Sequence, residues 1–167
     1  MGITLTQLLD ARDDRRARQL CLLASHPHRT LVVLTVNIPG SEKRTDDSLL
    51  IARAALAALH DRLDIVFEEN RDLPTGWESY LLVSSDPEST KCITVDIERA
   101  HPLGRLMDID VFRPDGIPMS RRDSNQAQRK CLICDDDARA CMRAAKHTVG
   151  QLTDKIHSMV HEYRSCN

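Results

Sequence analysis

The sequence has few aromatic residues, no long apolar run and no net positive charge. Phe, Trp and Tyr together make up 3% of its 167 residues, so the core must be aliphatic and base stacking is disfavoured. The formal net charge of −2 argues against a basic surface for nucleic acid. No apolar stretch approaches the length of a membrane span, and a charged run at 10–18 argues against a signal peptide. We therefore expect a cytoplasmic protein that binds neither nucleic acid nor membrane.

Length and apolar periodicity predict one domain over residues 1–167, with an α+β fold. Helices are predicted at 4–25, 46–63, 87–100, 135–146 and 152–163. Strands are predicted at 31–38, 65–68, 79–84 and 108–112, with a return strand at 117–119. For 87–100 the alternative is a strand, because Ile93, Val95 and Ile97 alternate with polar residues. Helices packed around a mixed or antiparallel sheet, with a central hairpin at 108–119, are the expected architecture.

The most informative feature is a pair of aspartates in the strand predicted at 108–112. Asp108 and Asp110 are two residues apart, so both point to one face of the strand, while Ile109 and Val111 point to the core. Two carboxylates so close repel each other unless a cation lies between them. A hard ion such as Mg²⁺ accepts one or two carboxylates and leaves its other positions for water and phosphate. The alternative is an exposed strand edge with two solvated aspartates.

The residues on either side of this strand favour phosphate binding. Gly104 permits close approach of backbone to a ligand, and Arg105 offers a planar guanidinium for phosphate. After the strand and a turn at 113–116, Arg121 and Arg122 follow the expected return strand. Carboxylates flanked by arginines suit a metal-complexed polyphosphate.

Several motifs together match the pattern of one known family. They are His101-Pro102-Leu103-Gly104-Arg105-Leu106, Asp108-Ile109-Asp110-Val111, Ser120-Arg121-Arg122 and Arg129-x-Cys131-Leu132-x-Cys134, with Cys141 and His147. The similarity extends back through Arg12, Arg15, Arg18-Gln19 and Pro39-Gly40. The chain thus resembles the CitX family of apo-citrate lyase phosphoribosyl-dephospho-CoA transferases, also called holo-citrate lyase synthases, over nearly its whole length.

This resemblance implies a nucleotidyltransferase. The donor would be 2′-(5″-triphosphoribosyl)-3′-dephospho-CoA, and the acceptor a serine of the acyl-carrier subunit of apo-citrate lyase, with release of pyrophosphate. We expect Asp108 and Asp110 to bind Mg²⁺, and Gly104, Arg105 and Arg121 or Arg122 to bind the leaving group. His101 is a candidate general base; the alternative is that it anchors the turn before Pro102.

A strand carrying paired carboxylates for phosphate transfer also suggests a likeness to polymerase-β-like nucleotidyltransferases, by analogy of fold alone. Residues 39–41 would then be the phosphate turn of that fold, or an ordinary turn at a strand end. Arg12, Arg15 and Arg18 recur at helical spacing, either as a solvated face or as a cationic stripe for phosphate or an acidic partner.

Cysteines form the second notable cluster. Cys131, Cys134, Cys141 and His147 have a ligand set suited to zinc, although their spacing is not that of a standard finger or ribbon. Cys134, Ala138, Cys141 and Ala145 instead recur at helical intervals, which favours small buried thiols. Two other functions compete with the transferase: a metal-dependent phosphodiesterase or nuclease using the same aspartates, and a non-catalytic, zinc-stabilised binding module.

Overall fold

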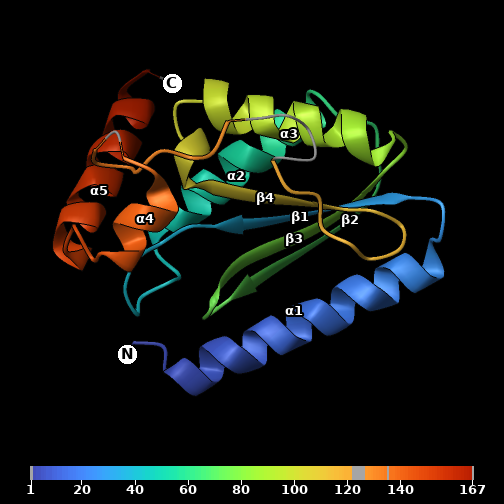
Figure 1. Ribbon diagram of the computed structural model, residues 1–167, viewed down its shortest axis with the longest axis horizontal. Coiled ribbons are helices and arrows are strands. Elements are labelled where there is room, and N and C mark those ends of the chain that lie inside the picture. The colour runs from blue at the N-terminus through green and yellow to red at the C-terminus, as the bar shows by residue number, and fades with distance from the viewer. Residues whose placement is uncertain (1, 122–126, 135, 167) are drawn as a thin grey trace.

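The computed structural model describes residues 2–121, 127–134 and 136–166, which form an antiparallel sheet between layers of helix (Figure 1). Its helices are α1 (Leu5–Ser25), α2 (Asp46–His60), α3 (Pro87–Ala100), α4 (Ala138–Arg143) and α5 (Val149–Cys166). Its strands are β1 (Thr30–Val36), β2 (Ile65–Leu73), β3 (Gly76–Val83) and β4 (Met107–Phe112), and a 3₁₀ turn, η1 (Gly104–Leu106), precedes β4. The predicted α+β fold with an antiparallel sheet is confirmed. None of the described helices is both long and apolar enough to span a membrane.

The sheet has the strand order β2-β3-β1-β4, which places β4 at an edge beside β1. Helices α2 and α3 cover one face and α1 covers the other (Figure 1). Because successive strand residues point to opposite faces, β1 contributes to both cores. Val32 and Leu34 pack with Ile109 on the α2–α3 side, whereas Val33 packs with Phe112 under α1.

Helix starts follow recognisable capping chemistry. The side chain of Thr45 caps α2, and Asp46 and Asp47 occupy its first turn, where the helix dipole favours negative charge. Asp86 caps α3 by accepting a hydrogen bond from the Ser89 backbone N–H at 2.9 Å. The segment at 87–100 is therefore a helix, and its alternation of β-branched residues did not decide its structure.

Three expected elements in the C-terminal third differ from the prediction. The return strand at 117–119 is reduced to an isolated bridge between Phe112 and Pro118, so among the described residues β4 has no full hairpin partner on its outer side. The helix expected at 135–146 is only α4, which Asp137 caps. Helix α5 begins at Val149 and not at residue 152, because Thr148 and Gln151 form a reciprocal cap about one turn earlier than expected.

Candidate active site

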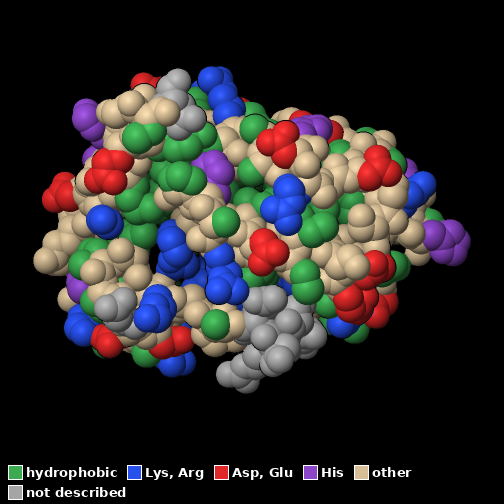
Figure 2. All heavy atoms as spheres, turned by 90° about the horizontal axis from the view of Figure 1, so that it is seen from above, with side chains coloured by type: hydrophobic (Ala, Val, Ile, Leu, Met, Phe, Trp, Pro, Cys, Tyr) green, Lys and Arg blue, Asp and Glu red, His purple; other side chains and the backbone are tan. Residues whose placement is uncertain are grey.

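A cavity of about 670 Å³ opens beside β4 and is lined by charged side chains from distant parts of the chain. The positive ones are Lys91 on α3, Arg105 on η1, Arg121 and Arg129 after β4, and Arg139 on α4. The negative ones are Glu98 on α3, Asp108 and Asp110 on β4, and the α4 cap Asp137. Figure 2 shows Lys and Arg side chains gathered at a hollow in the molecular surface. Such a cavity suits a large, strongly anionic ligand that carries a cation.

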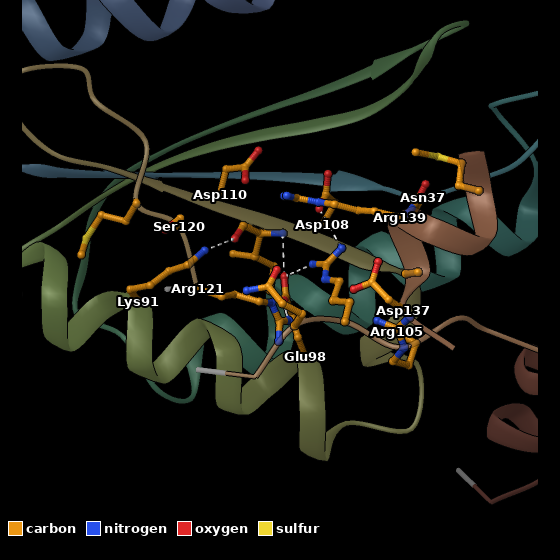
Figure 3. Close-up of a pocket in the computed structure, with 16 residues that line it drawn as sticks. Asn37, Lys91, Glu98, Arg105, Asp108, Asp110, Ser120, Arg121, Asp137 and Arg139 are labelled. Carbon is orange, nitrogen blue, oxygen red and sulfur yellow. Dashed lines mark hydrogen bonds and ion pairs between the residues drawn. The ribbon is translucent and has the colours of Figure 1, made fainter. Parts of the chain in front are cut away.

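The two aspartates of β4 lie as the sequence predicted. Ile109 and Val111 are buried in the core under α2 and α3, and Asp108 and Asp110 point the other way, into the cavity (Figure 3). Asp108 accepts a hydrogen bond from Arg129 Nη1 at 2.9 Å. Within the part of the chain that the structure describes, no hydrogen bond or ion pair reaches the Asp110 carboxylate. Its pKa is raised, first by desolvation and then by the charge of Asp108. The pair therefore leaves negative charge that a cation in the cavity would balance.

Glu98 organises the positive side of the cavity. Its carboxylate is 3% exposed and accepts hydrogen bonds from both Arg121 and Arg129. It also accepts the backbone N–H of Ile109 at 3.1 Å. A buried carboxylate is retained only when such partners satisfy it, so Glu98 fixes the two guanidinium groups at the edge of β4.

Lys91 lies about two helical turns before Glu98 and contacts the same edge of β4. Its ammonium donates to the carbonyl of Ile109 at 3.4 Å, and burial lowers its pKa. Sequence reasoning missed both α3 residues. The signal was present, because Lys91 and Glu98 are seven residues apart and fall on the inward face of the helix with Thr94 and Val95. Charged residues at core-facing positions mark a buried polar site.

Of the three arginines predicted to bind phosphate, Arg105 and Arg121 line the cavity. Arg105 is half-buried and donates to the carbonyl of Lys130, and Arg121 pairs with Glu98. Burial lowers the pKa of Arg105, and the nearby charges of Arg129 and Arg121 act in the same direction. Arg122 lies outside the described residues. Sequence reasoning gave no role to Arg139, which extends from α4 toward the aspartate pair (Figure 3).

The structure does not bring His101 to the cavity. Its Nδ1 accepts the backbone N–H of Leu103 at 3.0 Å, and its ring lies against Tyr163, with 5.4 Å between ring centroids. Burial lowers its pKa. These contacts favour the anchoring role that the sequence left open, and the general-base role stays a prediction without a geometric argument for it.

Gly104 is required for packing and not, as the sequence predicted, for close approach of the backbone to phosphate. Its N–H donates to the carbonyl of His101 at 2.8 Å, so this group is not available to phosphate. A Cβ at this position would lie 2.5 Å from the carbonyl oxygen of Glu98 and 2.7 Å from that of Ile97. The glycine thus allows η1 to pack against the end of α3, which positions β4.

Replacing this glycine should therefore destabilise the fold. We expect Gly104→Ala to lower the free energy of unfolding by about 1–3 kcal/mol, the range for overpacking against atoms that cannot move aside. Gly150→Ala is the matched control, because the nearest atom to its Cβ is Thr148 Oγ1 at 3.8 Å. That helical substitution should be neutral or stabilising by up to about 1 kcal/mol. Urea denaturation of both variants measures the difference, and equal stabilities would contradict the packing role.

Two other predicted phosphate or partner sites lie away from the cavity. The turn at 39–41 binds the N-terminus, since the Ser41 carbonyl accepts the Ile3 N–H at 2.8 Å. The expected arginine stripe does not face solvent as a unit, because Arg15 pairs with Glu78 and Arg18 with Glu69 on the sheet. Both pairs hold α1 to the sheet.

The helical-interval explanation of the cysteines is wrong. Helix α4 begins at Ala138 and ends at Arg143, so Cys134 precedes it, and Ala145 follows it with a positive φ of 45°. Of the cysteines at 131, 134 and 141, only Cys141 is buried. Small core-facing residues of one helix therefore do not account for this cluster.

Comparison with known proteins supports the family resemblance that the sequence motifs indicated. The pattern of the family described as CitX, apo-citrate lyase phosphoribosyl-dephospho-CoA transferase, matches residues 3–163. Two proteins with that same name, from Escherichia coli O1:K1 and Shigella flexneri serotype 5b, are each 34% identical to this chain over 171 aligned positions. Each alignment covers 99% of this chain and 93% of the relative. The chain therefore belongs to the CitX family of apo-citrate lyase phosphoribosyl-dephospho-CoA transferases.

Proposed function

We propose that this chain transfers the 2′-(5″-phosphoribosyl)-3′-dephospho-CoA group from its triphosphate precursor to a serine of the acyl-carrier subunit of apo-citrate lyase. The serine oxygen attacks the phosphorus nearest the ribose, and the bond from that phosphorus to the next phosphate breaks. Pyrophosphate leaves, and the serine proton is released. The observation that carries this proposal is a single cavity that joins a carboxylate pair with several guanidinium groups.

Asp108 and Asp110 would hold Mg²⁺. Both present hard oxygen donors on one face of β4, and the Asp110 carboxylate, which has no hydrogen bond or ion pair among the described residues, fits the charge of such an ion. When bound, Mg²⁺ neutralises charge on the donor phosphates and orients them. Glu98 already accepts hydrogen bonds from two arginines and from the backbone of β4. Water and substrate oxygens would therefore complete the coordination of the ion.

The arginines would stabilise the departing pyrophosphate. Phosphoryl transfer needs little covalent work from a protein and depends on positioning and on neutralising developing charge. Arg105 and Arg121 were expected in this role, and the cavity adds Arg129 and Arg139. Because Glu98 fixes Arg121 and Arg129 before substrate arrives, these donors need not reorganise during the reaction.

The test is an incubation of the chain with apo-carrier subunit, the triphosphate donor and Mg²⁺. Intact-mass analysis of the carrier should show a gain equal to the prosthetic group, with one pyrophosphate released per modified carrier. A phosphodiesterase would hydrolyse the donor and leave the carrier mass unchanged. A non-catalytic binding module would leave both donor and carrier unchanged. Either of these two results would overturn the proposal.

Arg105 provides a test of donor binding that is separate from the metal. Arg105→Lys keeps the charge and loses the planar pair of donors, so the KM for the triphosphate donor should rise. Arg105→Ala should raise it further, by about tenfold to a hundredfold, the scale of lost hydrogen bonds to a charged group. Arg113→Ala is the control, since Arg113 pairs with Glu88 outside the cavity. Steady-state kinetics measure both variants, and an unchanged KM in Arg105→Ala would remove this residue from the donor site.

A further inference from the structure

Four potential metal ligands converge outside the acidic part of the cavity. The Sγ atoms of Cys131, Cys134 and Cys141 and a ring nitrogen of His147 all lie within 4.8 Å of one another. The Cys134 and Cys141 sulfur atoms are 4.0 Å apart, and His147 Nε2 is 3.3 Å from Cys134 Sγ. Three sulfurs and one imidazole nitrogen at such separations can surround one ion.

The local backbone is shaped to bring these ligands together. Cys131 and Cys134 lie on a turn in which the Ile133 N–H points to Cys131 Sγ at 3.5 Å. The Cys131 N–H donates to the carbonyl of Asp136 at 2.7 Å, which closes the turn and leads into α4 with Cys141. After α4 the chain reverses, with the Lys146 N–H on the Cys141 carbonyl, and His147 returns to the cluster. Peptide N–H groups aimed at sulfur stabilise a thiolate, which is the metal-binding form.

The segment that carries these ligands has little core of its own. Of its described residues, 127–134 and 136–148, only Cys141 is buried, and Leu132 is partly buried against the main core. Units that bury so little apolar surface usually depend on a disulfide or a metal to hold their shape. A metal ion held by these four ligands would therefore supply stabilisation that the small core of this segment does not.

We propose that Cys131, Cys134, Cys141 and His147 bind one Zn²⁺ ion as a structural tetrahedral site. Thiolate and imidazole ligands in this number are those that Zn²⁺ takes in structural centres, whereas hard ions prefer the carboxylates of β4. All four positions are filled by the protein, so no position remains for substrate or water. The ion holds the segment in place.

The site also bears on the cavity, because the same segment forms one of its walls. Arg129 precedes the first ligand by two residues, and Asp137, Arg139 and Met142 lie between the second and fourth ligands. These residues line the cavity, whereas the four metal ligands are not among its lining residues. Zinc thus sets the position of Arg129 and Arg139 relative to the aspartate pair.

Metal content of the intact chain is the first test. Chain purified without chelators should carry one equivalent of zinc by elemental analysis, and native mass spectrometry should show it bound. Replacement by Co²⁺ should give the absorption of tetrahedral thiolate–cobalt coordination. Chelation should lower the melting temperature sharply, because metal binding contributes to folding free energy. Metal-free chain that keeps its melting temperature and does not bind Co²⁺ would overturn the proposal, as would a disulfide among these cysteines in place of zinc.

Variants identify the ligands independently of catalysis. Cys134→Ser and His147→Ala should lose most of the bound zinc, whereas His147→Cys restores a fourth ligand and should retain it. Cys92→Ser is the matched control, since Cys92 is an exposed free cysteine on α3. It should keep full zinc content and the same cobalt spectrum. Equal zinc loss in Cys92→Ser, or full zinc content in Cys134→Ser, would contradict the assigned ligand set even where a variant folds poorly.

Discussion

Asp110→Asn is expected to reduce transfer to the carrier by at least about a hundredfold, the scale of removing one preorganised electrostatic contact. The substitution keeps the shape of the side chain and removes one charge from the pair that faces the cavity. Asp108→Asn should act in the same direction, and it also removes the charge that pairs with Arg129. Carrier modification at limiting Mg²⁺, followed by intact mass, measures the loss. Near-normal transfer in Asp110→Asn would rule out the two-carboxylate mechanism.

The melting temperature of Asp110→Asn distinguishes a loss of transfer activity from misfolding. The raised pKa of Asp110 means that the folded chain holds this proton more tightly than the unfolded chain. The stability that the protonated Asp110 contributes to the fold is present below the ordinary aspartate pKa. It is lost as the pH rises through the raised pKa of the folded chain. At neutral pH the ionised group therefore destabilises the fold, and Asp110→Asn should leave the melting temperature unchanged or raise it. Asp96→Asn, on the exposed side of α3, is the control and should change neither transfer nor stability.

Glu98→Ala is expected to lower the free energy of unfolding by about 3–5 kcal/mol, the cost of breaking a buried charge pair. It removes the carboxylate that Arg121, Arg129 and the Ile109 N–H share, which leaves buried groups unpaired. Donor binding should weaken as well, because Arg121 loses its carboxylate partner and Arg129 keeps only its contacts with β4. Urea denaturation measures stability, and donor KM measures the second effect.

Glu88, on the same helix as Glu98, provides the matched control. Glu88 is 62% exposed and pairs with Arg113 at 3.5 Å, so Glu88→Ala should change stability by less than about 1 kcal/mol. If Glu98→Ala fails to fold, Glu98→Gln keeps the side-chain shape and an acceptor for Ile109, and should still raise the donor KM. Equal, small effects of the two alanine variants would show that the buried carboxylate does not organise the cavity.

The parts of the fold that local sequence patterns determine could be predicted. Helix α3 begins at Pro87 because Asp86 caps it and a helical face follows, and β4 follows the alternation of Asp108 and Ile109. The return strand could not be judged from residues 117–119 alone. Whether a neighbouring segment pairs along its length depends on what already occupies the strand edge. Here, side chains of α3 occupy part of it.

The candidate site was predicted only where its residues are close in sequence. Asp108, Asp110 and Arg105 fall within one decapeptide, so their proximity needs no knowledge of tertiary structure. Glu98 and Arg139 reach the cavity from separate helices, and only the packing of those helices brings them there. The cysteine cluster shows the same limit. Its spacing suited a helix, but a turn and a chain reversal determine where the sulfurs meet.

The occupied outer edge of β4 also bears on self-association. An edge strand with free N–H and C=O groups can pair with another copy of the chain and start aggregation. At β4, Glu98 and Lys91 bind both backbone groups of Ile109. The opposite edge, β2, carries exposed polar residues such as Glu68 and Asp72 and an irregular register near Ile65, which discourage strand addition by a different means. The charged contacts that organise the cavity thus also protect the edge of the sheet, so Glu98→Ala is expected to aggregate more readily.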